Sequence, residues 1–216
     1  MNFRALCVLS LGLALLTACA SETTPAATEA PVTQAVAQPS LLTAPTLEPT
    51  LAPTEPLPTQ MEVSLPFELI STAFSQGEPI PPRYSCKGED ISPSLAWGDP
   101  PEGTQSFVLI MDDPDAPGGT WIHWIVFNIP ADVRELPENM PAGMKFGDVA
   151  VSFGANSWGR AEYGGPCPPS GTHRYFFKLY ALDTTLALEP GARSKVLEAV
   201  EAHSLAKAEL MGTFSR

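Results

Sequence analysis

Two histidines and a group of aspartates lie at the ends of apolar segments, where polar side chains could form a site. Asp113 and Asp115 come directly after one apolar run, His123 interrupts a second, and His173 and Tyr175 begin a third. Imidazole and phenol groups can donate hydrogen bonds to phosphate oxygens. Carboxylates can hold an imidazole in a donating tautomer and raise its pKa, so these residues could together bind an anion.

Each of these residues also has a simpler interpretation. An Asp-Pro-Asp segment such as 113–115 commonly forms a turn whose side chains cap backbone amides. A single histidine in an apolar strand is more often a core residue with its hydrogen bonds satisfied. The hypothesis of a site depends on their joint occurrence, since two of the three histidines lie in such segments.

The loop at 164–175 is rich in glycine and proline and leads directly into an apolar run. Proline fixes φ and glycine frees it, so a loop of this composition can hold one defined shape. With side chains alternating along a strand, His173 and Tyr175 share a face, as Trp121 and His123 do in their own segment. We expect this loop to form one wall of a site.

A metal-dependent or acid/base enzyme is the main alternative chemistry. His123, His173 and the two aspartates could ligate a metal, but they come from separate segments without an H-E-x-x-H helix. The sequence has no G-x-S-x-G segment for a serine hydrolase and no paired CxxC metal site. The residues therefore favour a binding protein without a metal or cofactor over an enzyme.

The charge balance argues against nucleic acid as a partner. The chain has a formal net charge of −12, and most of the acidic excess lies after residue 60. An acidic domain without a basic stripe does not attract a phosphate backbone. One local anion pocket remains compatible with this composition.

The first eighteen residues resemble a lipoprotein signal peptide. Arg4 precedes an apolar run that ends in Leu-Thr-Ala before Cys19, like the lipobox of bacterial lipoproteins. We expect cleavage before Cys19, acylation of this cysteine, and anchoring at the outer face of a cell membrane or envelope. The alternative is an ordinary signal peptide with a chance cysteine.

Residues 19–60 are predicted to be a disordered tether after the acylated cysteine. Residues 20–60 contain no glycine, lysine, arginine or aromatic residue and are dominated by proline, threonine and alanine. Such a composition cannot bury a core. We expect a spacer between the membrane and a folded domain at 61–216.

The folded domain is predicted to be mainly β. Alternating or apolar segments rich in aromatic and β-branched residues indicate strands at 61–70, 106–111, 121–129 and 175–182. Residues 192–202 have the spacing of a helix, and residues 206–214 alternate as a closing strand. The segment 131–164 lacks periodicity and is expected to form long loops over one end of the sheets.

Three segments together resemble the phosphatidylethanolamine-binding protein family, which includes the Raf kinase inhibitor proteins. They are residues 112–117 (DDPDAP), His123 in its strand, and residues 165–175 (GPCPPSGTHRY). Residues 84–93 (YSCKGEDISP) are similar to the bacterial branch of the family. The resemblance covers essentially all of residues 61–216.

The resemblance implies a large antiparallel sheet packed on a smaller one, with a peripheral C-terminal helix. It also implies a small pocket for phosphate or a phospholipid head group, formed here by Asp113, Asp115, Trp121, His123, Gly165, Pro166, His173 and Tyr175. Ile122 stands where many eukaryotic members have another histidine, and their C-terminal pocket-covering segment is not recognisable. Head-group specificity and kinase regulation are therefore not carried over.

Cys86 and Cys167 are predicted to form a disulfide, since export would place them in an oxidising compartment and both lie in loops expected at the same end. Two independent buried thiols are the alternative. The function expected from all these features is that of a membrane-tethered anion-binding protein, which could modulate a protein partner. A surface that inhibits an envelope protease or a signalling protein is a second hypothesis.

Overall fold

The computed structural model of the protein describes residues 66–216. The predicted signal peptide, the acylated Cys19 and the tether lie outside the described residues and stay predictions. None of the described helices has the length and apolar character needed to cross a membrane.

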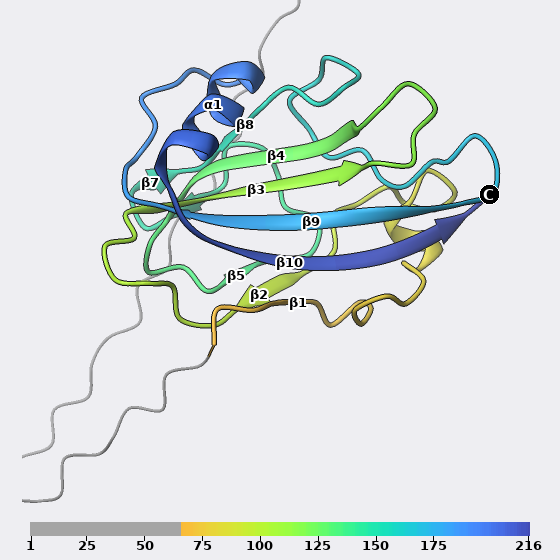
Figure 1. The fold of residues 1–216 in the computed structure, drawn as a ribbon, viewed down its shortest axis with the longest axis horizontal. Coiled ribbons are helices and arrows are strands. Elements are labelled where there is room, and N and C mark those ends of the chain that lie inside the picture. The colour runs from red at the N-terminus through yellow and green to blue at the C-terminus, as the bar shows by residue number, and fades with distance from the viewer. Residues whose placement is uncertain (1–65) are drawn as a thin grey trace, which may run out of the picture. The chain divides into compact units, whose positions relative to one another are not determined.

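The fold is built around a five-stranded antiparallel sheet in the order β10-β9-β3-β4-β8 (Figure 1). Its central strand β3 (Ser106–Asp113) is buried along its whole length. The neighbouring strands are β4 (Trp121–Pro130) and β9 (Thr172–Leu182), which are also largely buried. The continuous apolar runs of the sequence are thus explained by a sheet that is covered on both faces.

A smaller sheet covers one face of the large one. It consists of β1 (Leu69–Ile70), β2 (Leu95–Trp97) and β5 (Glu135–Leu136). Its buried residues form one core cluster with the large sheet, in which the Trp97 and Phe107 rings pack edge to face at 5.4 Å. The strand expected at 61–70 is thus only Leu69–Ile70 within the described residues.

The opposite face of the large sheet is covered by helix α1 (Arg193–His203). Val196 and Val200 of this helix are buried against β3 and β4 residues that include Val108 and Ile125. This arrangement confirms the predicted fold of two packed sheets with one peripheral helix near the C-terminus.

Both edges of the large sheet are short or partly covered. On one edge, β10 (Ser204–Ser215) alternates as predicted, with Ala208, Leu210, Gly212 and Phe214 buried. Segment 76–80 runs along its second half: the Gly77 amide donates to the Met211 carbonyl at 2.8 Å and the Ile80 amide to the Thr213 carbonyl at 2.7 Å. The other edge is β8 (Ser152–Phe153), a strand of two residues.

Segment 131–164 is mostly loop, as predicted, but it also contains four short strands. Besides β5 and β8 these are β6 (Lys145–Phe146) and β7 (Val149–Ala150), which pair with each other. Strands of two residues are too short to produce a recognisable alternation in the sequence. A 3-10 turn, η1 (Pro82–Tyr84), begins the loop that carries Cys86.

Candidate functional site

The polar segments singled out in the sequence meet at one end of the large sheet. Because β3 is antiparallel to both β4 and β9, its end lies near their starts: Asp113 pairs with Trp121, the first residue of β4, and Asp112 pairs with Phe176, the fifth residue of β9. Figure 1 shows the tip of β3 at the end of the sheet where β4 begins, with β9 extending past it towards the C-terminus. The antiparallel order alone therefore brings the three predicted segments together.

A pocket of about 260 Å³ opens at this end of the sheet. Three of the predicted site residues, Asp113, Trp121 and His123, line it. The rest of its lining comes from loops: Ala116, Pro117, Gly118, Trp158, Cys167 and Pro169.

His123 is held in one orientation within the pocket wall. Its Nδ1 lies 2.7 Å from the carbonyl oxygen of Gly164, and its ring packs edge to face against Trp158 at 5.0 Å and Tyr175 at 5.2 Å. Only 3% of the residue is exposed, and this burial lowers the pKa of His123 despite the nearby charge of Asp113. The expectation that the acidic neighbours raise its pKa is wrong for His123, because desolvation of the imidazolium outweighs their attraction.

Asp113 forms the predicted carboxylate–imidazole pair, and its partner is His173. Nδ1 of His173 lies 2.7 Å from Oδ2 of Asp113, and the Asp115 amide donates to Oδ1 at 2.8 Å. Both carboxylate oxygens are thus occupied. His173 is buried and lies outside the pocket lining, where it positions Asp113.

Asp115 does not reach the pocket, because its carboxylate is engaged elsewhere. It accepts hydrogen bonds from the amide, Nε and a terminal guanidinium nitrogen of Arg174 at 3.0, 2.9 and 2.7 Å. These hydrogen bonds lower the pKa of Asp115 to about 2. The sequence predicts Asp115 beside a histidine of the site. In the structure its carboxylate instead holds the loop that follows β3 to the start of β9.

An Asp115→Asn substitution is expected to destabilise the domain slightly at neutral pH, by no more than about 1 kcal/mol because the pair is partly exposed. A carboxyl whose pKa is lowered on folding stabilises above its unfolded pKa and loses this effect as the pH falls through its folded pKa. The difference between the variant and the parent should therefore shrink as the pH falls from about 4 to 2. Urea unfolding at several pH values measures it, and a difference that grows in acid would contradict the assignment.

Tyr175, Gly165 and Pro166 lie behind the pocket wall and do not line it. Tyr175 is fully buried, and its hydroxyl lies near Asp113 and the backbone of Cys167. Burial raises the pKa of Tyr175, and the charge of Asp113 adds to this shift. The Gly165 amide donates to Asp90 at 2.7 Å, while the Pro166 carbonyl accepts from the Cys86 amide at 3.2 Å.

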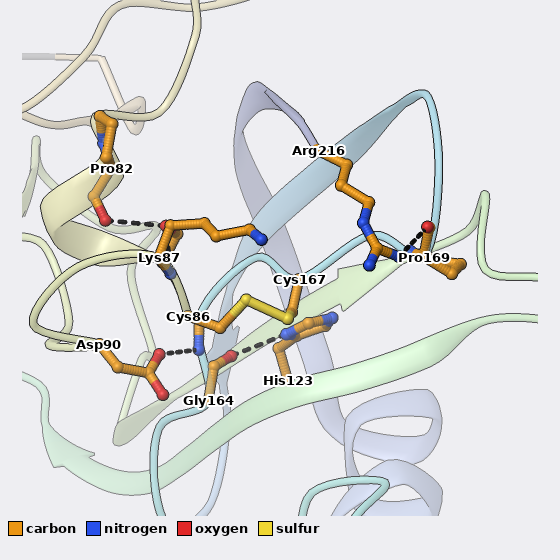
Figure 2. Close-up of a disulfide and its surroundings, with 11 residues drawn as sticks. Pro82, Cys86, Lys87, Asp90, His123, Gly164, Cys167, Pro169 and Arg216 are labelled. Atoms are coloured by element: carbon orange, nitrogen blue, oxygen red, sulfur yellow. Dashed lines mark hydrogen bonds between the residues drawn. A yellow bond between two sulfur atoms is a disulfide. The ribbon is translucent and has the colours of Figure 1, made fainter.

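The predicted disulfide between Cys86 and Cys167 is confirmed, with the two Cα atoms 5.5 Å apart. Figure 2 shows it beside the His123 ring, between the loop that begins at η1 and the loop that precedes β9. Since Cys167 lines the pocket, the disulfide fixes part of the pocket wall to the opposite loop.

Trp158 is the main pocket residue that the sequence did not indicate. It is 42% exposed, and its ring packs edge to face on both Trp121 at 5.4 Å and His123 at 5.0 Å. It belongs to the loop segment without periodicity, so only its aromatic type could have drawn attention to it. The neighbouring Trp121 has a buried indole N–H without a hydrogen-bond partner in the described part of the chain.

Other hollows of the described surface lack the combination of histidine and aspartate found in this pocket. A larger pocket of about 590 Å³ lies between the 155–159 loop and the start of α1 and has no histidine, aspartate or cysteine in its lining. A third, of about 340 Å³, is lined by Asp112, whose carboxylate pairs with Lys178 at 2.6 Å. Within residues 66–216, no three His, Cys, Asp or Glu side chains gather closely enough to hold a metal ion.

The fold and the pocket together define a β-rich domain with a small polar pocket at one end of its main sheet. Residues 70–215 match the phosphatidylethanolamine-binding protein family, and the chain belongs to this family. The resemblance drawn from the three sequence segments is thereby confirmed.

Relatives and solved structures of the family extend over the same domain. A UPF0098 protein of Methanothermobacter thermautotrophicus is 53% identical over 151 residues, covering 69% of this chain and 99% of the relative. A UPF0098 protein of Aquifex aeolicus is 51% identical over 155 residues, covering 69% and 89%. The crystal structure of a phosphatidylethanolamine-binding protein homologue from Chlamydia trachomatis is similar with a TM-score of 0.63 and 44% identity, covering 69% of this chain and 97% of that one. The E. coli YbcL structure, described as a new member of the mammalian family, has a TM-score of 0.63 and 36% identity, covering 69% and 98%.

Proposed function

We propose that the protein is a binding protein, and not an enzyme, whose pocket beside His123 takes a phosphate group, either free or in a phospholipid head group. The observation that carries this proposal is the pocket itself, where Asp113, Trp121 and His123 converge at one end of the sheet in a chain of the phosphatidylethanolamine-binding protein family. A small hollow with a few convergent polar side chains is the usual form of a ligand site.

The size and charge of the pocket support a small oxyanion. Asp113, its one carboxylate, already accepts hydrogen bonds from His173 and from the Asp115 amide, which spread its negative charge. At the rim, the Arg216 guanidinium donates to the carbonyl of Pro169, itself a lining residue (Figure 2). A cation next to a small pocket favours a ligand of negative charge.

The proposal places this domain outside the cytoplasm, on a tether anchored in a membrane by the acylated Cys19. The signal-peptide pattern before Cys19 and the Pro/Thr/Ala composition of residues 20–60 support this placement. A disulfide between Cys86 and Cys167 fits an oxidising compartment. Modulation of a protein partner stays a prediction.

Inorganic phosphate and glycerophosphoethanolamine, titrated separately, test the pocket. The imidazole NMR signals of His123 and His173 should shift, while those of His203, which is exposed at the end of α1, should not. Unchanged His123 and His173 signals, or equal shifts of all three histidines, would reject the pocket.

A Trp158→Ala substitution removes the aromatic wall and is expected to weaken binding about five- to tenfold, or ~1–1.4 kcal/mol. Leu205→Ala is the matched control, because Leu205 is a large apolar residue of similar exposure outside the pocket. Calorimetric titration of both variants measures the difference. Equal affinities would remove Trp158 from the site.

A further inference from the structure

The hydrogen bond of His123 determines which ring nitrogen carries the proton. Nδ1 lies 2.7 Å from the carbonyl oxygen of Gly164, and a carbonyl oxygen can only accept. Nδ1 is therefore the protonated nitrogen. In the neutral ring the other nitrogen, Nε2, then has no hydrogen and carries a lone pair.

The polar contacts of the His123 ring within residues 66–216 are to the backbone of Gly164 and Gly165, and the hydrogen bond to Gly164 is made by Nδ1, while no hydrogen bond to Nε2 is formed there. Figure 2 shows this second nitrogen on the side of the ring away from Gly164. Since His123 lines the pocket, the neutral ring offers a ligand an acceptor and no donor. This reverses the donor role expected for the histidine from the sequence.

The surroundings of His123 favour its neutral form when the pocket holds no anion. The charged groups near the ring are Asp113 and Asp112 from β3 and Asp90 from the loop after η1, all attractive to an imidazolium. The uncharged neighbours of the imidazole are the rings of Tyr175 in β9 and of Trp158, which both pack edge to face against it. Burial outweighs the carboxylates, so the ring loses its proton more readily than a free histidine.

A phosphate oxygen without a hydrogen and the Nε2 lone pair would repel each other at hydrogen-bonding distance. One proton must lie between them for the two to make contact. A phosphate monoester or hydrogen phosphate can supply this proton from its own P–O–H group. A phosphodiester has none, so the imidazole must take one up from the solvent.

We propose that the pocket binds phosphate oxyanions together with one proton held between His123 Nε2 and the ligand, and thus favours phosphates that carry a P–O–H group. This inference rests on the proposed phosphate site and specifies its ligand class. In a bound diester, the bond formed is Nε2–H and the proton comes from the buffer. In bound hydrogen phosphate, the P–O–H group donates to Nε2 and the ligand keeps its proton.

Calorimetric titration at pH 8 in buffers of different ionisation enthalpy tests the proposal. Glycerophosphoethanolamine, a diester, should bind with uptake of about one proton per ligand, and its affinity should fall about tenfold per pH unit in this range. Inorganic phosphate should bind with much smaller uptake. Diester binding without proton uptake would overturn the inference and leave the phosphate site standing.

A second readout uses the parent protein alone. The ¹⁵N shift of Nε2 in His123 should be that of an unprotonated nitrogen at pH 8 and should become that of a protonated one when the diester is added. A protonated Nε2 in the free protein would overturn the inference. Absence of binding by both probes would overturn the phosphate site and the inference together.

His123→Gln is the informative variant, because the glutamine amide can present an N–H donor without taking up a proton. It should bind the diester with no proton uptake and with little pH dependence between pH 6 and 9. Its folding is checked by thermal unfolding beside the parent. Should it fail to fold, the ¹⁵N measurement on the parent decides.

Discussion

Replacing Cys86 and Cys167 together by serine is expected to lower the free energy of unfolding by about 2–5 kcal/mol. The disulfide joins residues separated by 81 positions, so its loss returns a large conformational freedom to the unfolded chain. Phosphate binding should weaken as well, because Cys167 lines the pocket and would no longer be fixed to the loop after η1. Denaturant unfolding and phosphate titration measure the two effects.

Reduction of the parent protein provides the control for this substitution. A reducing agent should destabilise the parent to about the level of the double serine variant and leave the variant unchanged. Equal stability of parent and variant in the absence of reductant would show that the loops are held by their other contacts. Those contacts include the hydrogen bond between the Cys86 amide and the Pro166 carbonyl.

Gly165→Ala is expected to cost about 2–4 kcal/mol of stability, although it adds one methyl group. A Cβ atom at Gly165 would lie 2.3 Å from the Tyr84 carbonyl oxygen and 2.6 Å from Oδ1 of Asp90. The backbone at Tyr84 cannot retreat easily, because its carbonyl also accepts a hydrogen bond from Tyr163 at 2.7 Å. The substitution should also weaken the 2.7 Å hydrogen bond from the Gly165 amide to Asp90.

Gly118→Ala is the matched control for this prediction. A Cβ at Gly118 meets no atom within 4 Å, so its stability should stay within about 0.5 kcal/mol of the parent. Urea unfolding of the two variants side by side measures the contrast. Indistinguishable midpoints would contradict the close packing of Gly165 against the loop after η1.

The long elements of the fold could be predicted because their residues repeat a pattern over many positions. A continuous apolar run predicts strand β3, and the alternation of apolar and polar residues predicts β10. The meeting of Asp113, Trp121 and His123 also follows from sequence, once the three segments are assigned to neighbouring antiparallel strands. The disulfide follows in turn, because it joins two loops at that same end.

Three features of the site could not be predicted, because they depend on contacts between loops. Trp158 reaches the pocket from a segment without periodicity. Asp115 pairs with Arg174 and does not line the pocket. This pairing depends on where the loop after β3 passes the start of β9. The carbonyl of Gly164 determines which ring nitrogen of His123 carries the proton. Every residue has a backbone carbonyl, so the sequence does not indicate which one will contact the ring.

The coverage of the sheet edges has a consequence for how copies of this domain behave at high concentration. An uncovered edge strand offers a row of free amides and carbonyls to which a second chain can add. Segment 76–80 occupies that row along the second half of β10, and the first half carries Lys207 and Glu209 at exposed positions. At the other edge, β8 has only two residues and offers few free backbone groups to a second molecule. The domain should therefore stay monodisperse at concentrations at which a sheet with long uncovered edges would associate.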